Sequence, residues 1–196
     1  MRNIAILLIS ITLLAACGEV QVPTEPPALV SPPSVAENGF LTAYVEETIP
    51  MELTELRTFM DEQPLISFLE PTENIANPVA SEVLGGNWPQ PGAKRWLRLA
   101  DGHYIIERVI ENEPDFFKYQ VFFFTNAVGR GVDQIVGEQR FVSVGDSTRF
   151  EWTYNVLPKN FITRQVVRGN MDEIEGYIGS GLQGFAAAAS AAATTQ

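Results

Sequence analysis

The chain has 196 residues, a single cysteine, a single histidine and a formal net charge of −11 at pH 7. One cysteine excludes an internal disulfide, and one cysteine with one histidine argues against a zinc site built from these residue types. The negative charge argues against nucleic acid as a partner, because phosphate backbones would be repelled. The sequence contains no nucleophile elbow, phosphate-binding glycine loop or dinucleotide motif, so we expect neither a metal nor an organic cofactor.

The first 16 residues have the pattern of a secretory signal peptide. A positive charge at Arg2 precedes an apolar run from Ile4 to Leu14, which is shorter than the roughly 20 residues that span a bilayer. Residues 14–17, Leu-Ala-Ala-Cys, resemble the lipobox of bacterial lipoproteins. The resemblance implies that residues 1–16 are removed and that Cys17 is acylated, with palmitate or a similar chain. An ordinary signal peptide with a chance cysteine is the alternative.

Position 18 indicates which membrane carries the anchor. Aspartate after the acylated cysteine commonly retains lipoproteins in the inner membrane, and this chain has Gly18 there. We therefore expect a lipid-anchored protein of the bacterial cell envelope, on the outer membrane and facing the periplasm. Residues 17–38 predict an extended tether between the lipid and a folded domain, because they contain no aromatic residue and five prolines: Pro23, Pro26, Pro27, Pro32 and Pro33.

Strand and helix patterns follow one another from residue 39 to residue 185, which we assign to one domain. Alternation predicts a first strand over 40–49, followed by a short helix over 52–60 and a second short helix and loop over 61–78. Further strands are predicted at 79–84, 94–99, 103–111, 116–125, 135–144 and 148–156. A long helix is predicted from apolar residues spaced three or four apart: Val167, Met171, Ile174, Ile178, Leu182 and Phe185.

Helices at the start and end of a run of strands are typical of an α+β fold. We expect a curved antiparallel sheet of about six or seven strands wrapped on the long C-terminal helix, with two short helices after the first strand. Five glycines between Gly169 and Gly184 weaken this helix. They either leave room for a ligand or break the helix near Gly179. The alanine-rich tail of residues 186–196 is expected to fray.

Several segments resemble, in order, the START-like superfamily, also called SRPBCC or helix-grip, and more closely its polyketide cyclase/dehydrase-type branch. The similar segments are residues 86–95, 99–102, 106–109, 117–121, 137–141 and 148–154. The resemblance covers roughly residues 40 to 185. It implies a deep apolar cavity between the sheet and the long helix, which in this family usually holds a hydrophobic small molecule. Some members of the family are cyclases or hydrolases.

Strand alternation assigns side chains to the cavity that the resemblance implies. The candidate ligand-binding residues share the predicted inner face, the loop before it or the long helix: Trp88, Ile105, Tyr119, Phe123, Gln139, Phe141, Phe150, Trp152, Tyr154, Ile174 and Ile178. Trp88 would form a lid over one cavity mouth or pack under its own loop. The alternative for the aromatic residues is that they fill an ordinary core, because large cavities are costly.

Glu107 is the candidate catalytic residue. It lies between Ile105 and Val109 on the predicted inner face, where a carboxylate must be neutral, paired or hydrated. One interpretation is a ligand-orienting group or a general acid/base with a raised pKa. The alternatives are a salt bridge with Arg95 or Arg140, or an inverted face assignment that leaves Glu107 in solvent.

Three functions are compatible with these features. The first, which we favour, is a membrane-anchored lipoprotein that binds a lipid or other hydrophobic small molecule without catalysis. The second is a cyclase- or dehydratase-like enzyme that uses Glu107 on a hydrophobic substrate. The third is a protein-interaction module with a vestigial cavity, in which Phe122 and Phe124, opposite the predicted inner face, form an exposed apolar patch.

Overall fold

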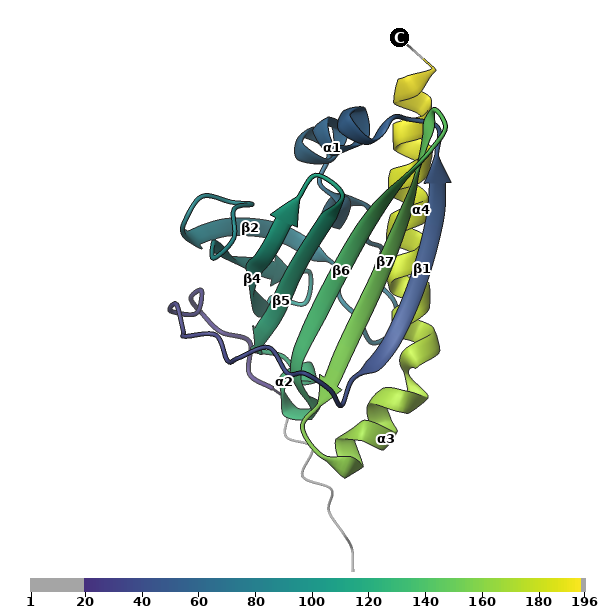
Figure 1. Cartoon of the computed structure of the whole chain (residues 1–196). Helices are drawn as coiled ribbons and strands as arrows, with labels where there is room; N and C mark the ends of the chain where they lie inside the picture. The colour runs from purple at the N-terminus through teal and green to yellow at the C-terminus, as the bar shows by residue number, and fades with distance from the viewer. Residues whose placement is uncertain (1–19, 195–196) are drawn as a thin grey trace, which may run out of the picture.

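The computed structural model describes residues 20–194, so the predicted signal peptide and the predicted acylation site at Cys17 lie outside the described residues. Within this range, seven strands form one antiparallel sheet in the order β1-β7-β6-β5-β4-β3-β2 (Figure 1). Consecutive strands from β2 to β7 are neighbours, and β1 joins the sheet beside β7. The strands are β1 (Leu41–Ile49), β2 (Pro78–Gly85), β3 (Lys94–Leu99), β4 (Tyr104–Glu113), β5 (Phe116–Phe124), β6 (Val132–Val144) and β7 (Ser147–Pro158).

The described chain also contains five helical segments. α1 (Leu53–Glu62) and the 3-10 helix η1 (Leu65–Phe68) follow β1, and α2 (Val128–Gly131) joins β5 to β6. α3 (Phe161–Gly169) and α4 (Met171–Ala193) follow the sheet, and α4 packs along β1 and η1 (Figure 1). The structure confirms the predicted α+β helix-grip fold, with a curved antiparallel sheet, two short helices after the first strand and a long C-terminal helix.

The C-terminal helix breaks and ends at positions other than those expected. The break lies at Asn170, between α3 and α4, and α4 is continuous through its glycines. A Cβ at Gly181 would come within 2.7 Å of Leu69 Cδ2, so this glycine lets the segment after η1 approach the helix closely. The fraying expected from residue 186 is wrong for the described part of the tail, because α4 continues to Ala193 and buries Ala189 completely.

A β-bulge in β5 changes which side chains face the α4 side of the sheet. The pairing with β4 skips Phe122, which is the extra residue. The bulge disrupts the alternation, so Phe122 and Phe123 both face the outer side, away from α4, and Phe124 turns inward. The outer-face cluster consists of Trp96, Tyr104, Ile106 and Phe122. Phe123 is therefore not an inner-face residue, and the predicted exposed patch is wrong because Phe122 is buried.

The proline-rich segment before β1 is extended, but its described part is not a free tether. It crosses the outer face of the sheet (Figure 1), where Val30 packs against the outer-face cluster. Arg108 Nη2 donates a hydrogen bond to Pro33 O at 3.0 Å, and Gln134 Nε2 donates to Ser34 O at 3.2 Å. The segment is therefore fastened to the sheet, which shortens the chain available between the domain and Cys17.

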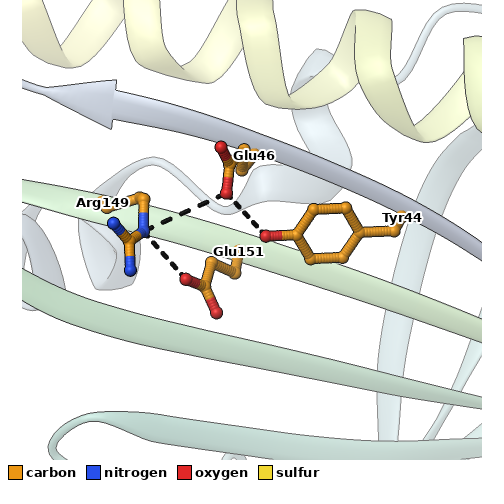
Figure 2. A network of polar contacts seen from close by, with 4 residues as sticks. All are labelled: Tyr44, Glu46, Arg149 and Glu151. Atoms are coloured by element: carbon orange, nitrogen blue, oxygen red, sulfur yellow. Dashed lines mark hydrogen bonds and ion pairs between the residues drawn. The ribbon is translucent and has the colours of Figure 1, made fainter.

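The outer face near β1 carries a polar network instead of an apolar cover. Figure 2 shows Tyr44 and Glu46 of β1 beside Arg149 and Glu151 of β7. The Tyr44 hydroxyl donates to Glu46 Oε2 at 2.6 Å, and Arg149 Nε donates to Glu151 Oε1 at 2.8 Å. The hydrogen bond to Glu46 is the main cause that raises the pKa of Tyr44 to about 12. Exposed networks of this kind contribute little to stability, so this one marks a solvated face.

Candidate ligand-binding cavity

A cavity of about 210 Å³ lies between the inner face of the sheet, the α1–η1 segment and α4. Strands β3 to β7 supply one wall, the η1 region supplies Leu65 and Leu69, and α4 supplies Tyr177 and Ile178. These four side chains are at least nine-tenths buried. The cavity therefore occupies the position between sheet and long helix that the sequence resemblance implies.

Seven of the eleven candidate ligand-binding residues line this cavity. They are Trp88, Ile105, Tyr119, Gln139, Trp152, Tyr154 and Ile178. Glu107, the candidate catalytic residue, lines it as well. The structure brings these residues together at one wall, and their role in binding stays a prediction.

The other four candidates do not reach the cavity wall. Phe123 faces the outer side because of the bulge. Phe141 and Phe150 share the correct face but lie nearer the β6–β7 hairpin, where their ring centroids are 4.6 Å apart and Phe150 packs against Phe185 of α4. These two rings fill the core, which was the alternative expected for the aromatic residues. Ile174 packs against the same core one turn before Ile178.

The cavity also includes residues that sequence reasoning missed: Arg57, Asn112, Asn126, Phe124, Val128 and Tyr177. Tyr177 lies three residues after Ile174, so the helical spacing of the apolar stripe could have indicated it. Phe124 required knowledge of the bulge. The others come from α1, the end of β4 and the short connection between β5 and β6, where no periodic pattern assigns a side chain to a face.

Tyr119 reaches the cavity because its partner on the neighbouring strand is glycine. Tyr119 on β5 pairs with Gly137 on β6. A Cβ at position 137 would lie 2.1 Å from Tyr119 Cζ, so the ring occupies the space that a side chain there would fill. The ring also stacks on Phe117, with centroids 5.8 Å apart. The absence of a side chain at position 137 therefore lets the Tyr119 ring lie against the neighbouring strand.

Hydrogen-bond donors gather at the cavity wall, where Tyr119, Trp152, Tyr154 and Tyr177 all contribute side chains. Trp152 Nε1 is buried and has no hydrogen-bond partner among the described residues. Trp152 lowers the pKa of Tyr119, although the indole N–H and the Tyr119 hydroxyl do not meet hydrogen-bond geometry. Burial is the main cause that raises the pKa of each of the three tyrosines, and the charge of Glu107 adds to the shift at Tyr119 and Tyr154.

The Glu107 carboxylate is paired within the cavity wall. Arg95 Nε and Nη2 both lie 2.5 Å from Glu107 Oε1. The Arg95 guanidinium also lies over the Trp88 ring, 3.8 Å from its centroid. This is the salt bridge expected as one alternative to a catalytic role, and Trp88 covers it. The acid/base role of Glu107 stays a prediction.

Hydrogen bonds tie α1 to the loop that carries Trp88. Arg57 Nη2 donates to Asn112 Oδ1 at 2.6 Å, and Asn112 Nδ2 donates to Pro89 O at 3.2 Å. Burial lowers the pKa of Arg57, whose guanidinium lies 4.8 Å from the centroid of the Phe141 ring. These contacts join α1, β4 and the loop before β3 at one end of the cavity.

Metal-ligand clusters and membrane-spanning helices are both absent from the described part of the chain. Residues 20–194 hold no group of three or more histidine, cysteine, aspartate or glutamate side chains placed to bind a metal ion. No helix in the same range combines the length and the apolar character that crossing a bilayer requires.

Solved structures of low sequence identity share this fold. Ara h 8.0201 aligns with a TM-score of 0.51 at 18% identity, over 71% of this chain and 98% of that chain. TTHA0849 from Thermus thermophilus aligns with a TM-score of 0.57 at 14% identity, over 78% and 99%. The major latex-like protein 151 of Panax ginseng aligns with a TM-score of 0.57 at 11% identity, over 76% and 97%. No protein-family model and no curated protein matches the sequence.

Proposed function

We propose that this protein binds a small, mostly apolar molecule in the cavity between the sheet and α4, and that a lipid on Cys17 holds it on the bacterial cell envelope. One observation carries the binding proposal: a cavity of about 210 Å³ whose wall combines apolar side chains with the unpartnered indole N–H of Trp152. An empty cavity and an unpaired buried donor both destabilise the folded state. A ligand that fills the cavity and accepts this hydrogen bond would offset both costs.

The cavity volume limits the size of the ligand. An engineered core cavity of about 150 Å³ binds benzene, whereas pockets for drug-sized ligands measure about 300–1,000 Å³. The cavity of about 210 Å³ lies between these two values. We infer a ligand with one substituted ring or a short chain, because a complete membrane lipid would require the cavity to widen.

The cavity wall favours a neutral ligand with an acceptor oxygen. Trp152 Nε1 can only donate a hydrogen bond, and the raised pKa values keep the three tyrosine hydroxyls protonated at neutral pH. Burying an ionised carboxylate beside these side chains would cost its desolvation, because the wall cation Arg95 is already paired with Glu107. A carbonyl or ether oxygen on an apolar molecule fits this wall better than a carboxylate.

Three probe molecules with the same number of non-hydrogen atoms test the assignment. Acetophenone carries a carbonyl, cumene replaces it with apolar carbon, and benzoate adds a charge. We expect calorimetric titration to show that Trp152→Phe weakens acetophenone binding up to roughly tenfold, because a hydrogen bond contributes about 0.5–1.5 kcal/mol. Cumene should bind both proteins alike, and benzoate should bind neither detectably. Because each ligand is compared between the wild-type protein and Trp152→Phe, the free energy of removing that ligand from water is the same in both measurements and cancels.

The outcomes separate the donor role from the binding role. Equal weakening of acetophenone and cumene by Trp152→Phe would contradict the donor role, because both ligands lose the packing of the indole. Failure of acetophenone and cumene to bind the wild-type protein would contradict the proposed function itself. Benzoate binding more tightly than acetophenone would contradict the preference for a neutral ligand.

The enzyme alternative has no structural feature in its favour beyond the position of Glu107. Glu107 Oε1 already accepts hydrogen bonds from Arg95. The predicted likeness to the polyketide cyclase/dehydrase branch rests on sequence segments alone.

The proposed lipid anchor has its own test. The mass of the mature chain should match cleavage before Cys17 plus acyl chains, and Cys17→Ala should remove the protein from the membrane fraction.

A further inference from the structure

One helix of the domain presents an apolar face to solvent. Phe161, Ile162 and Val166 of α3 are 75%, 77% and 61% exposed, which makes them the three most exposed large apolar side chains among residues 20–194. Their spacing places them on one side of the helix, opposite the buried Val167 that fastens α3 to the domain. A contiguous exposed apolar face of this kind indicates a contact surface.

Positive charge accompanies this apolar face. Residues 159–170 contain Lys159, Arg164 and Arg168 and no aspartate or glutamate, although the whole chain has a net charge of −11. Arg164 Nη1 donates to Gly39 O at 2.6 Å, which fixes its guanidinium beside the helix. A helix with an apolar face flanked by arginine and lysine is typical of segments that lie in the interface of an anionic membrane.

The position of α3 in the fold brings it to the end of the sheet from which the chain leads back to Cys17. α3 follows the end of β7 and contacts α2, which joins the end of β5 to the start of β6. The β3–β4 turn lies at this same end of the sheet, and Gly102 in that turn contacts Val22 of the N-terminal segment. Cys17 precedes Val22 by five residues, which span at most about 18 Å.

We propose that α3 docks on the membrane surface, with Phe161, Ile162 and Val166 among the acyl chains and Lys159, Arg164 and Arg168 at anionic lipid headgroups. The inference rests in part on the proposed lipid anchor, because one short helix face alone binds a bilayer only weakly. The anchor and the fastened N-terminal segment hold this end of the sheet near the bilayer, and α3 supplies the second contact. Val128 of α2 lines the cavity, so docking also turns this end of the cavity toward the membrane.

A fluorescent label at two positions tests the docking. The full chain is purified from bacterial membranes as Gln165→Cys or Asp146→Cys, labelled with an environment-sensitive dye, and placed in vesicles of phosphatidylethanolamine with phosphatidylglycerol and a spin-labelled lipid quencher. Gln165 lies on the apolar face of α3, and Asp146 lies in the β6–β7 hairpin at the opposite end of the sheet. The label at 165 should be quenched and the label at 146 should not.

Variants and vesicles serve as controls for the kind of contact. Phe161→Ser with Ile162→Ser should abolish the quenching at 165, and Arg164→Gln with Arg168→Gln should reduce it. Vesicles of phosphatidylcholine alone should also show weaker quenching, because they lack the anionic headgroups. Equal signals at 165 and 146 on vesicle-bound protein would overturn the docking, as would a dimer in solution that Ile162→Ser dissociates.

Mass spectrometry of the same samples separates this inference from the anchor on which it partly rests. An acylated chain that floats with the vesicles but remains unquenched at 165 refutes the docking and leaves the anchor intact. A chain without acyl groups refutes the anchor, and the docking then stands only if that chain still floats and is quenched at 165.

Discussion

The ring of Tyr119 lies directly over Gly137, its partner across the β5–β6 ladder. The residue at position 137 on β6 therefore affects the shape of the cavity, because Tyr119 on β5 lines the cavity. A side chain at 137 would push the ring away from the sheet, and the cavity is the space available to receive it.

We therefore predict that Gly137→Ala abolishes ligand binding while the protein still folds. The displaced Tyr119 ring should fill the cavity and abolish acetophenone binding in a calorimetric titration, while the overpacking costs about 1–3 kcal/mol of unfolding free energy. Gly176→Ala is the matched control, because a Cβ there meets nothing within 4 Å. Unchanged acetophenone binding by Gly137→Ala would show that the ring can move elsewhere.

Two glycines of α4 should respond to alanine with opposite signs. Gly176 is exposed and open, so Gly176→Ala should stabilise the protein by about 0.5–1 kcal/mol through helix propensity. Gly181 lies against Leu69, so Gly181→Ala should destabilise it by about 1–3 kcal/mol through overpacking. Urea unfolding of both variants measures the difference. Two changes of the same sign would refute the close approach of Leu69 to the helix.

The ion pair between Arg95 and Glu107 should behave as a buried structural pair. Glu107→Gln leaves the mostly buried Arg95 without its carboxylate and should cost about 3–5 kcal/mol of unfolding free energy. Arg95→Met combined with Glu107→Gln should recover most of that loss, because no unpaired charge remains. A double-mutant cycle in urea measures the coupling. If the separate losses of Glu107→Gln and Arg95→Met simply add in the double variant, the pair is not coupled and Glu107 is open to another role.

Alkaline pH should destabilise the protein through the buried tyrosines. Tyr119, Tyr154 and Tyr177 ionise near pH 10 in the unfolded chain, but burial raises their pKa in the folded protein. Their stabilising contribution is therefore complete below about pH 10 and is lost as the pH rises toward the folded pKa values. The unfolding free energy should fall by up to roughly 1.4 kcal/mol per pH unit for each of them.

Urea unfolding between about pH 9 and pH 12 measures how steeply the unfolding free energy falls with pH. This pH range begins below the ordinary tyrosine pKa. Tyr154→Phe should make the slope shallower, because it removes the contribution of one buried tyrosine to the pH dependence of the unfolding free energy. Tyr44→Phe gives the comparison for an exposed tyrosine: it should also make the slope shallower, because the pKa of Tyr44 is raised to about 12, mainly by the hydrogen bond to Glu46. A slope that Tyr154→Phe leaves unchanged would contradict the burial of this hydroxyl.

Much of the fold follows from local pattern. Alternation located the strands, and the spacing of Val167, Ile178 and Phe185 located the C-terminal helices, because both patterns depend on one buried face. Where the helix breaks was not predictable from glycine content. The glycines of α4 are tolerated because tertiary contacts such as that of Gly181 with Leu69 stabilise the helix, and the break falls instead at Asn170.

The cavity was only partly predictable, for two physical reasons. A bulge is a property of two paired strands, so the sequence of β5 alone could not show that Phe123 faces outward and Phe124 inward. Alternation assigns a residue to a face of the sheet but does not show how far along the strand it lies. Phe141 and Phe150 were therefore assigned to the correct face, but they lie nearer the β6–β7 hairpin than the cavity. The Arg57–Asn112 contact joins segments 55 residues apart, and no local pattern indicates it.

The most direct test of a ligand-binding cavity is to fill it from within. Val121 lines the cavity and is 2% exposed, whereas Val144 is 47% exposed at the β6–β7 hairpin. In a calorimetric titration with acetophenone, the wild-type protein and Val144→Phe should each bind one molecule per chain, and Val121→Phe should bind none. Binding that persists in Val121→Phe, or its absence from the wild-type protein, would contradict the account.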